Sequence, residues 1–205
     1  MSPNRNLVIW TAALSLLAAC DDPPKADDSN FEKTLQGYYD SHPVCVAIPL
    51  TFPVELRSDG DAARKQQLQP LVAAGLIAVT TIQKNESAAS GQGQATDNLR
   101  YAPTAAGEKV LRKGADSFLG GTDICFARRK VVKIESFTEP ADAAGVKVSR
   151  VTYDYELKDV EPWATETDIA GAFPKIAALL AKPGNQATDV LVRTDNGWKH
   201  ERDVR

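Results

Sequence analysis

Two long stretches near the C-terminal end of the chain alternate apolar with polar residues, and they constrain the fold more than any other feature. One runs from Ile124 to Phe137 and the other from Val146 to Tyr155, with "ADAAG" between them. Successive side chains of a strand point to opposite faces, so this alternation predicts two strands, each with one buried face. The short link that contains glycine predicts a hairpin, and therefore an antiparallel sheet.

The positions of the apolar residues predict which side of this sheet faces inward. In the first strand we expect Val132, Ile134 and Phe137 to lean toward the core. In the second strand the apolar spacing changes between Val148 and Val151, which predicts a β-bulge near Ser149. Its expected inward residues are Val146, Val148, Val151, Tyr153 and Tyr155.

The remaining C-terminal segments predict a helix and a second hairpin. The stretch "PWATETDIAGAFPKIAALLAK" predicts a helix that is broken or kinked at Pro174, because proline cannot donate the backbone hydrogen bond. The stretch "ATDVLVRTDNGWKHE" predicts two strands around Asp195-Asn196-Gly197, a strong signal for a tight turn. We therefore expect residues 119–205 to form an antiparallel β-sheet with one packed helix.

Residues 30–118 mix helical and extended patterns. We expect a helix over 30–41 capped by Ser29 or Asn30, a second helix over 59–75, strands at "LIAVTTIQ" and "LRYAP", and a short helix from Thr104 through Lys113. With the C-terminal sheet, this order predicts an α+β fold. The two halves, 30–118 and 119–205, form either two domains or one continuous domain.

One part of this half carries a combination of short motifs. Gly75-Leu76-Ile77 ends a helix, and Tyr101-Ala102-Pro103-Thr104-Ala105-Ala106-Gly107 follows after a strand and a polar loop. Over residues 61–113 this order resembles the C-terminal half of a winged helix-turn-helix domain, in which the return strand leads into a Tyr-x-Leu-Thr-x-x-Gly signature. Pro103 stands in place of the usual leucine. The resemblance implies a winged-helix-like module.

The same stretch departs from the winged helices that read DNA. Those proteins place a basic helix in the major groove, whereas "QLQPLVAAG" has no Lys or Arg after Lys65. The whole chain carries a formal net charge of −3 and offers no basic field for nucleic acid. We therefore expect no nucleic acid partner.

The N-terminus predicts where the protein is sent. The apolar run from Leu7 to Ala19 has the length of an export signal and is too short to span a bilayer. Leu17-Ala18-Ala19-Cys20 resembles the lipobox of bacterial lipoproteins. Residues 20–29 are charged and rich in proline, so they predict a flexible tether that does not pack.

The lipobox resemblance implies a signal peptide over residues 1–19, acyl chains on Cys20 and a membrane anchor that faces the periplasm. Two or three acyl chains hold a protein durably, because each buried CH₂ contributes about 0.8 kcal/mol. Asp21 resembles the signal that retains lipoproteins in the inner membrane, and the outer membrane is the alternative. An ordinary secretory signal with an unrelated cysteine is the other interpretation.

The other two cysteines predict a disulfide. Cys45 and Cys125 form an even pair in an oxidising compartment, and neither lies in a C-x-x-C motif that would favour redox chemistry. Two buried free thiols are the alternative. Closing a loop of this length would stabilise the fold by about 4 to 5 kcal/mol in the chain-entropy account.

Residues able to carry chemistry are few. His42 and His200 lie at opposite ends of the mature chain, and each is expected to be a surface or partly buried residue rather than a base or a metal ligand. No metal or cofactor motif is present. Asp154 and Glu156 lie two apart on a predicted strand, so both face one side, where they form either an acid–base pair or a solvated face.

The stretch "FARRKVVK" contains a local basic patch at the start of a strand. Arg128, Arg129, Lys130 and Lys133 could meet anionic lipid head groups or an acidic partner. The other interpretation is edge-strand charge that prevents sheets from pairing with one another.

As a whole the chain resembles the uncharacterised lipoproteins of Gram-negative bacteria. The resemblance favours a non-enzymatic binding or scaffolding protein, held at a membrane and presenting a surface to another envelope protein. The alternatives are a hydrolase of envelope polymers that uses Asp154 and Glu156, and a periplasmic immunity or inhibitor protein.

Overall fold

A computed structural model describes residues 25–84, 96–114 and 121–204. The predicted α+β class is confirmed, because helices accompany antiparallel sheets. The helices are α1 (Asp28–Ser41), α2 (Ala62–Ala73), α3 (Gly107–Val110), α4 (Thr167–Ala172) and α5 (Pro174–Leu180), with 3₁₀ turns η1 (Pro162–Thr165) and η2 (Glu201–Asp203). The strands are β1 (Val44–Ile48), β2 (Val54–Arg57), β3 (Ile77–Lys84), β4 (Thr96–Pro103), β5 (Leu111–Lys113), β6 (Thr122–Phe137), β7 (Ala141–Ala143), β8 (Val146–Lys158), β9 (Asn185–Thr194) and β10 (Gly197–His200).

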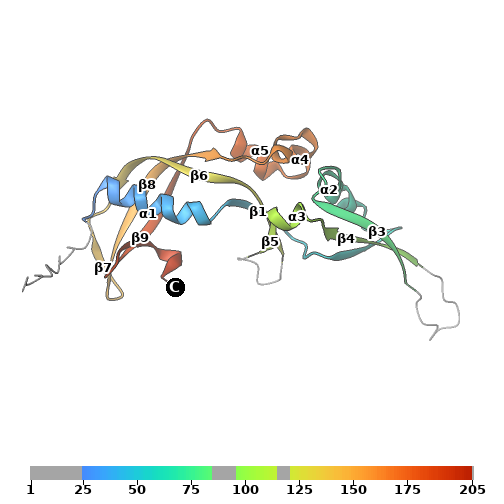
Figure 1. Ribbon diagram of the computed structural model, residues 1–205, viewed down its shortest axis with the longest axis horizontal. Coiled ribbons are helices and arrows are strands. Elements are labelled where there is room, and N and C mark those ends of the chain that lie inside the picture. Colours follow the sequence, from blue (N-terminus) through green and yellow to red (C-terminus); the bar gives the residue numbers. More distant parts are fainter. Residues whose placement is uncertain (1–24, 85–95, 115–120, 205) are drawn as a thin grey trace, which may run out of the picture.

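These strands form two antiparallel sheets within the described residues. One has seven strands in the order β1-β6-β8-β9-β10, with β5 also paired to β6 and β7 to β8. The other has three strands in the order β2-β4-β3. In Figure 1 the molecule is elongated, with α1 across β6, β8 and β9 and the three-stranded sheet at the other end.

Helix α1 covers the larger sheet with an apolar face. Phe31 and Leu35 are completely buried, and the ring of Phe31 makes edge contacts with Phe137 and Trp198. The helix begins at Asp28, because the Asp27 carboxylate accepts the N–H of Asn30 at 2.9 Å and caps it. The cap predicted at Ser29 or Asn30 is therefore wrong, and α1 includes the last two residues of the predicted tether.

Besides the hydrophobic cluster under α1, a second cluster connects α2 and the smaller sheet to α4 and α5. Leu68 and Leu71 of α2 share it with Ile169 of α4 and Ile176 of α5, and all four are fully buried. Both this cluster and the one under α1 draw residues from both sides of residue 118. Pro174 is the first residue of α5, so the break predicted there separates two short helices.

The inward face of β8 differs from the prediction at three positions: Val146 is exposed, Val148 is half-buried, and Ser149 takes an inward place instead. Ser149, Val151 and Tyr153 are completely buried, and the pairing of β8 with β9 continues through them without a shift in register. The bulge predicted near Ser149 is therefore wrong. Ser149 occupies an inward position because its hydroxyl donates to the Thr138 carbonyl at 2.7 Å, which satisfies the buried polar group.

The bulges lie instead in β6, where the register with β8 shifts between Val131 and Lys133 and again between Ile134 and Ser136. A bulge changes which side chains face inward. Val131 is 1% exposed and Val132 is 51% exposed, so the inward position predicted for Val132 is wrong.

Thr104 and Gly107 follow β4 and pack against the end of α2. Gly75 ends α2 with φ +70°, and Leu76 N–H bonds to the Leu71 carbonyl across it. The Thr104 hydroxyl donates to the Gly75 carbonyl at 2.6 Å and accepts the N–H of Gly107 at 3.0 Å. The helix after Thr104 ends at Val110 and not at Lys113, because residues 111–113 pair with β6 as β5.

We expect Gly107→Ala to lower the free energy of unfolding by about 3 kcal/mol, because the backbone at residue 107 must move away from the backbone of Leu76. A Cβ on Gly107 would lie 1.8 Å from the Leu76 carbonyl oxygen. Urea unfolding followed by circular dichroism measures this loss. Gly37→Ala in α1 is the matched control: a Cβ there meets nothing within 4 Å, so the stability should stay equal or rise slightly. Equal effects of the two changes would contradict the close approach.

Candidate functional site

A cavity of about 890 Å³ lies where α1 ends, beside the ladder of β1 and β6. Its walls come from the C-terminal end of α1, the strands β1, β5 and β6, and the C-terminal end of the chain. The residues that matter for its chemistry are Tyr38, Tyr39, His42, Arg112, Lys113, Asp123, Arg129, Asp189, His200 and Arg202.

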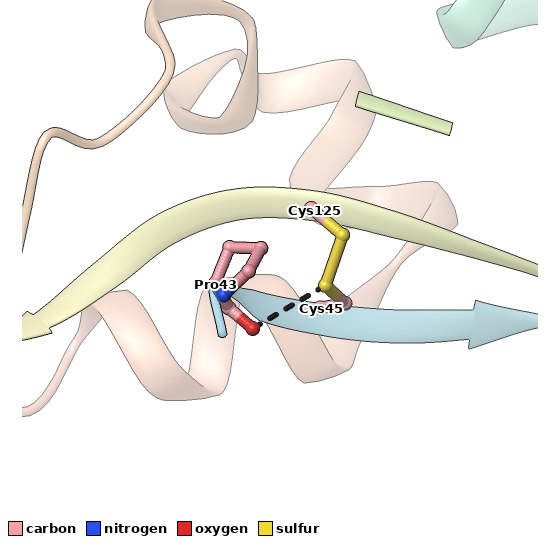
Figure 2. Close-up of a disulfide and its surroundings, with 3 residues drawn as sticks. All are labelled: Pro43, Cys45 and Cys125. Atoms are coloured by element: carbon pink, nitrogen blue, oxygen red, sulfur yellow. Dashed lines mark hydrogen bonds between the residues drawn. A yellow bond between two sulfur atoms is a disulfide. The ribbon is translucent and has the colours of Figure 1, made fainter. Parts of the chain in front are cut away.

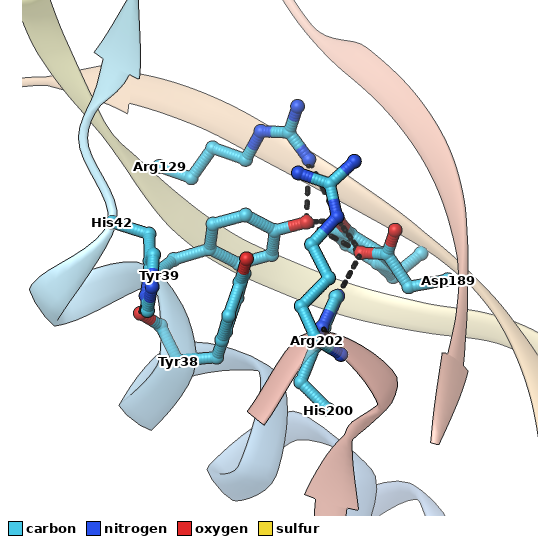
Figure 3. Close-up of polar contacts among 8 residues, drawn as sticks. Tyr38, Tyr39, His42, Arg129, Asp189, His200 and Arg202 are labelled. Atoms are coloured by element: carbon cyan, nitrogen blue, oxygen red, sulfur yellow. Dashed lines mark hydrogen bonds and ion pairs between the residues drawn. The ribbon is translucent and has the colours of Figure 1, made fainter. Parts of the chain in front are cut away.

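One wall of the cavity is a network of hydrogen bonds around a carboxylate (Figure 3). The hydroxyl of Tyr39 donates to Asp189 Oδ2 at 2.5 Å, and the hydroxyl of Tyr153 donates to the same oxygen at 2.6 Å. Arg129 Nη1 donates to both hydroxyl oxygens, at 2.8 Å each. The network therefore joins α1, β6, β8 and β9 at one point.

Arg129 is held in place by aromatic rings as well. Its guanidinium carbon lies 4.6 Å from the ring centre of Tyr39 and 4.3 Å from that of Tyr155. Such contacts stabilise a cation that has lost part of its water. Arg129 thus supplies a fixed positive charge that is connected to Asp189 through the hydroxyls of Tyr39 and Tyr153.

These contacts shift the pKa values of the three acids in opposite directions. Burial, together with the hydrogen bonds to Asp189, raises the pKa of the Tyr39 and Tyr153 hydroxyls well above the usual value. Burial also acts to raise the pKa of Asp189, but the contacts with His200, Tyr153 and Tyr39 outweigh it and hold that pKa far below the usual value. Both tyrosines therefore stay protonated while Asp189 stays ionised at neutral pH.

His200 lies beside the carboxylate, and one of its two ring nitrogens is hydrogen-bonded. Its Nδ1 accepts the backbone N–H of Arg202 at 3.2 Å, so in the neutral ring the proton is on Nε2. Nε2 lies 3.6 Å from Asp189 Oδ2, an ion-pair distance rather than a hydrogen bond. The interpretation of His200 as a surface or partly buried residue is wrong, because its side chain is 3% exposed.

The two histidines are brought together by Tyr38. The ring of Tyr38 stacks on His200 at 3.7 Å between ring centres and on His42 at 3.9 Å. His42 Nδ1 lies 2.8 Å from the Tyr38 carbonyl at the end of α1, which fixes the outer ring of the stack. His42 and His200 lie far apart in the sequence, yet both stack on the same tyrosine.

The disulfide joins β1 to β6 beside the cavity (Figure 2). Cys45 and Cys125 face each other across β1 and β6 at an S–S distance of 2.11 Å, so the predicted pair is at bonding distance. Both residues line the cavity. The bond attaches β1, which follows α1 directly, to the strand that carries Arg129.

The predicted carboxylate pair lies on the other side of β8. Asp154 accepts a hydrogen bond from Gln186 at 3.1 Å, and Glu156 forms an ion pair with Lys158 at 2.8 Å. Both alternate with the inward Tyr153 and Tyr155, so they face away from the network, and neither lines this cavity. Their placement matches a solvated strand face.

Strand alternation also divides the basic patch. Arg129 points toward α1, whereas Lys130 is exposed and Lys133 pairs with Glu135 at 2.9 Å. Arg128 donates to the Asp40 carbonyl at the end of α1. Of the four basic residues, Arg129 is the one that reaches the cavity.

Cys20 and Asp21 lie outside the described residues. Within the described ranges, no group of three or more His, Cys, Asp or Glu side chains is arranged to hold a metal ion. No described helix is both long enough and apolar enough to cross a membrane.

No family model, curated protein or solved structure matches this chain.

Proposed function

We propose that this protein is a lipid-anchored, periplasm-facing binding module that takes its ligand in the cavity beside the disulfide. The observation that carries the proposal is that the cavity is roomy while the acids of its polar wall are already hydrogen-bonded to one another. Asp189 accepts hydrogen bonds from two tyrosines and stays ionised, and both tyrosines keep their protons at neutral pH. Such groups hold a shape and a charge but do not exchange protons with a substrate.

The proposed anchor rests on the lipobox and is consistent with where the fold begins. Helix α1 starts at Asp28, so only residues 21–27 separate the proposed lipidated Cys20 from the packed domain. Seven residues span at most about 25 Å. The cavity would therefore stay close to the membrane surface, in reach of envelope components, with Asp21 favouring the inner membrane.

We also propose that residues 61–113 are a winged-helix-like module with a structural task. The support is the helix α2, the strand order β2-β4-β3 and the contact between Thr104 and the end of α2. In this protein α2 buries Leu68 and Leu71 against α4 and α5. A helix covered in this way supports packing and not recognition of nucleic acid.

The test is site-specific photo-crosslinking in intact cells, with the full-length chain. A photoreactive phenylalanine analogue replaces Ala47, an exposed residue of the cavity rim, or Val132, which is exposed on the outward side of β6. We expect position 47 to capture a defined envelope molecule that position 132 does not. The same capture from both positions, or none from position 47, would refute the binding function of the cavity.

The same cells test the anchor. Wild-type protein should fractionate with membranes and incorporate a palmitate analogue, whereas Cys20→Ser should do neither. Labelling that persists in Cys20→Ser would show that the lipobox interpretation is wrong.

A further inference from the structure

From the charges around the cavity we infer its ligand class: a small anion, with a carboxylate or phosphate group attached to an apolar or aromatic body. This inference rests on the proposed binding function and goes beyond it by naming the chemistry of the ligand. It is carried by the charges, their arrangement and the apolar surface between them.

The cavity is basic in a protein that is acidic as a whole. Arg112, Lys113, Arg129 and Arg202 line it, against the carboxylates of Asp123 and Asp189, while the whole chain has a formal charge of −3. A concave surface focuses the field of its lining charges, which favours a ligand of the opposite sign. The lining therefore selects an anion over a cation.

The two carboxylates offset only part of this field, because four basic side chains line the cavity against two acids. Asp189 is engaged by Tyr39, Tyr153 and His200 and lies 2.5 Å from the nearest hydroxyl oxygen. Asp123 lies on β6 directly opposite Arg112 of β5 in the strand register. Arg112 therefore faces Asp123, while Lys113, Arg129 and Arg202 outnumber Asp189.

The basic groups lie on two walls. Arg129 is fixed between the rings of Tyr39 and Tyr155 on the α1 side, whereas Arg112 and Lys113 are exposed on β5. A fixed guanidinium on one wall and two flexible cations on the other can enclose a carboxylate or phosphate group. The arrangement resembles neither a solvated helix face nor an internal ion pair.

The surface between these walls is apolar. Tyr38, Pro43, Val44, Ile48 and Pro49 line the cavity together with the disulfide. Such a surface favours an apolar or aromatic group over water, and polar groups at its edge then orient the ligand. An inorganic anion alone would leave this surface without a partner, so the anionic group should be joined to an apolar body.

The experiment uses the full mature protein, reconstituted into phosphatidylcholine nanodiscs and titrated by calorimetry at constant ionic strength. Phenyl phosphate is the probe, and phenol and inorganic phosphate are its neutral and non-aromatic halves. Arg112→Gln with Lys113→Gln removes two charges from the cavity rim. Lys130→Gln with Arg150→Gln is the matched control, because these exposed residues do not line the cavity.

We expect phenyl phosphate to bind at least tenfold more tightly than phenol or phosphate. The rim variant should lose at least tenfold in affinity, and the control variant less than twofold. Nanodiscs that contain phosphatidylglycerol distinguish two sources of the anion. A weaker apparent affinity there identifies a lipid head group as the competitor, and an unchanged affinity identifies a soluble anion.

Absence of binding by phenyl phosphate, or an equal loss in the rim and control variants, overturns the inference. The proposed binding function is tested independently, by crosslinking from position 47. If position 47 captures an envelope molecule while phenyl phosphate does not bind, the cavity binds a ligand of another class. If neither occurs, both proposals fall.

Discussion

Replacing either Cys45 or Cys125 with serine is expected to lower the free energy of unfolding by about 4 kcal/mol. The two residues are separated by 80 positions, so the bond closes a long loop and restricts the unfolded chain strongly. It also ties β1, and through it α1, to β6. Guanidinium unfolding of each variant, followed by tryptophan fluorescence, measures the loss.

A double-mutant cycle identifies the bond as the cause. Cys45→Ser and Cys125→Ser should destabilise the protein equally, and the double variant should be no worse than either, because one bond is lost in all three. Wild-type protein kept reduced should match the variants. Additive losses would mean that each cysteine contributes through its own packing and that no bond forms.

Strand alternation was sufficient to predict much of this fold. It located β6 and β8, predicted the inward Tyr153 and Tyr155, and placed Asp154 with Glu156 on a common face. It failed at Val132, because a bulge in β6 shifts the faces and the shift depends on pairing with β8. A bulge is a property of two strands, so the pattern of one strand does not reveal it.

The members of the network could not be grouped from the sequence. Tyr39, Arg129 and Asp189 lie far apart in the chain and meet because α1 packs across the sheet and β9 pairs with β8. One signal was nevertheless available. Arg129 shares an inward face with Val131, and Asp189 shares one with Leu191. A cation and an acid at inward positions of two strands predict a buried pair, since an unpaired buried charge is costly.

Asp189 is the acceptor at the centre of the network, so its replacement should strongly lower the stability of the protein. We expect Asp189→Asn to lower the free energy of unfolding by about 3 kcal/mol at pH 7, because two hydroxyls lose their ionised acceptor. Asp154→Asn is the matched control: Asp154 also accepts one side-chain hydrogen bond but faces away from the network, and its loss should cost less than about 1 kcal/mol. Urea unfolding of the two variants and wild type gives the comparison.

The pH dependence separates the charge of Asp189 from its shape. The folded pKa of Asp189 is depressed, so its ionised form stabilises the fold above the unfolded pKa of about 3.9, and this contribution disappears as the pH falls through the folded pKa. Asparagine does not titrate, so the gap in stability between wild type and Asp189→Asn should be constant from pH 7 to about pH 5. It should then shrink steadily below about pH 4. Subtracting the two profiles removes the titration of every other carboxylate. A gap that stays constant down to the lowest accessible pH would mean that Asp189 acts through its shape alone, and that its negative charge does not hold this wall of the cavity together.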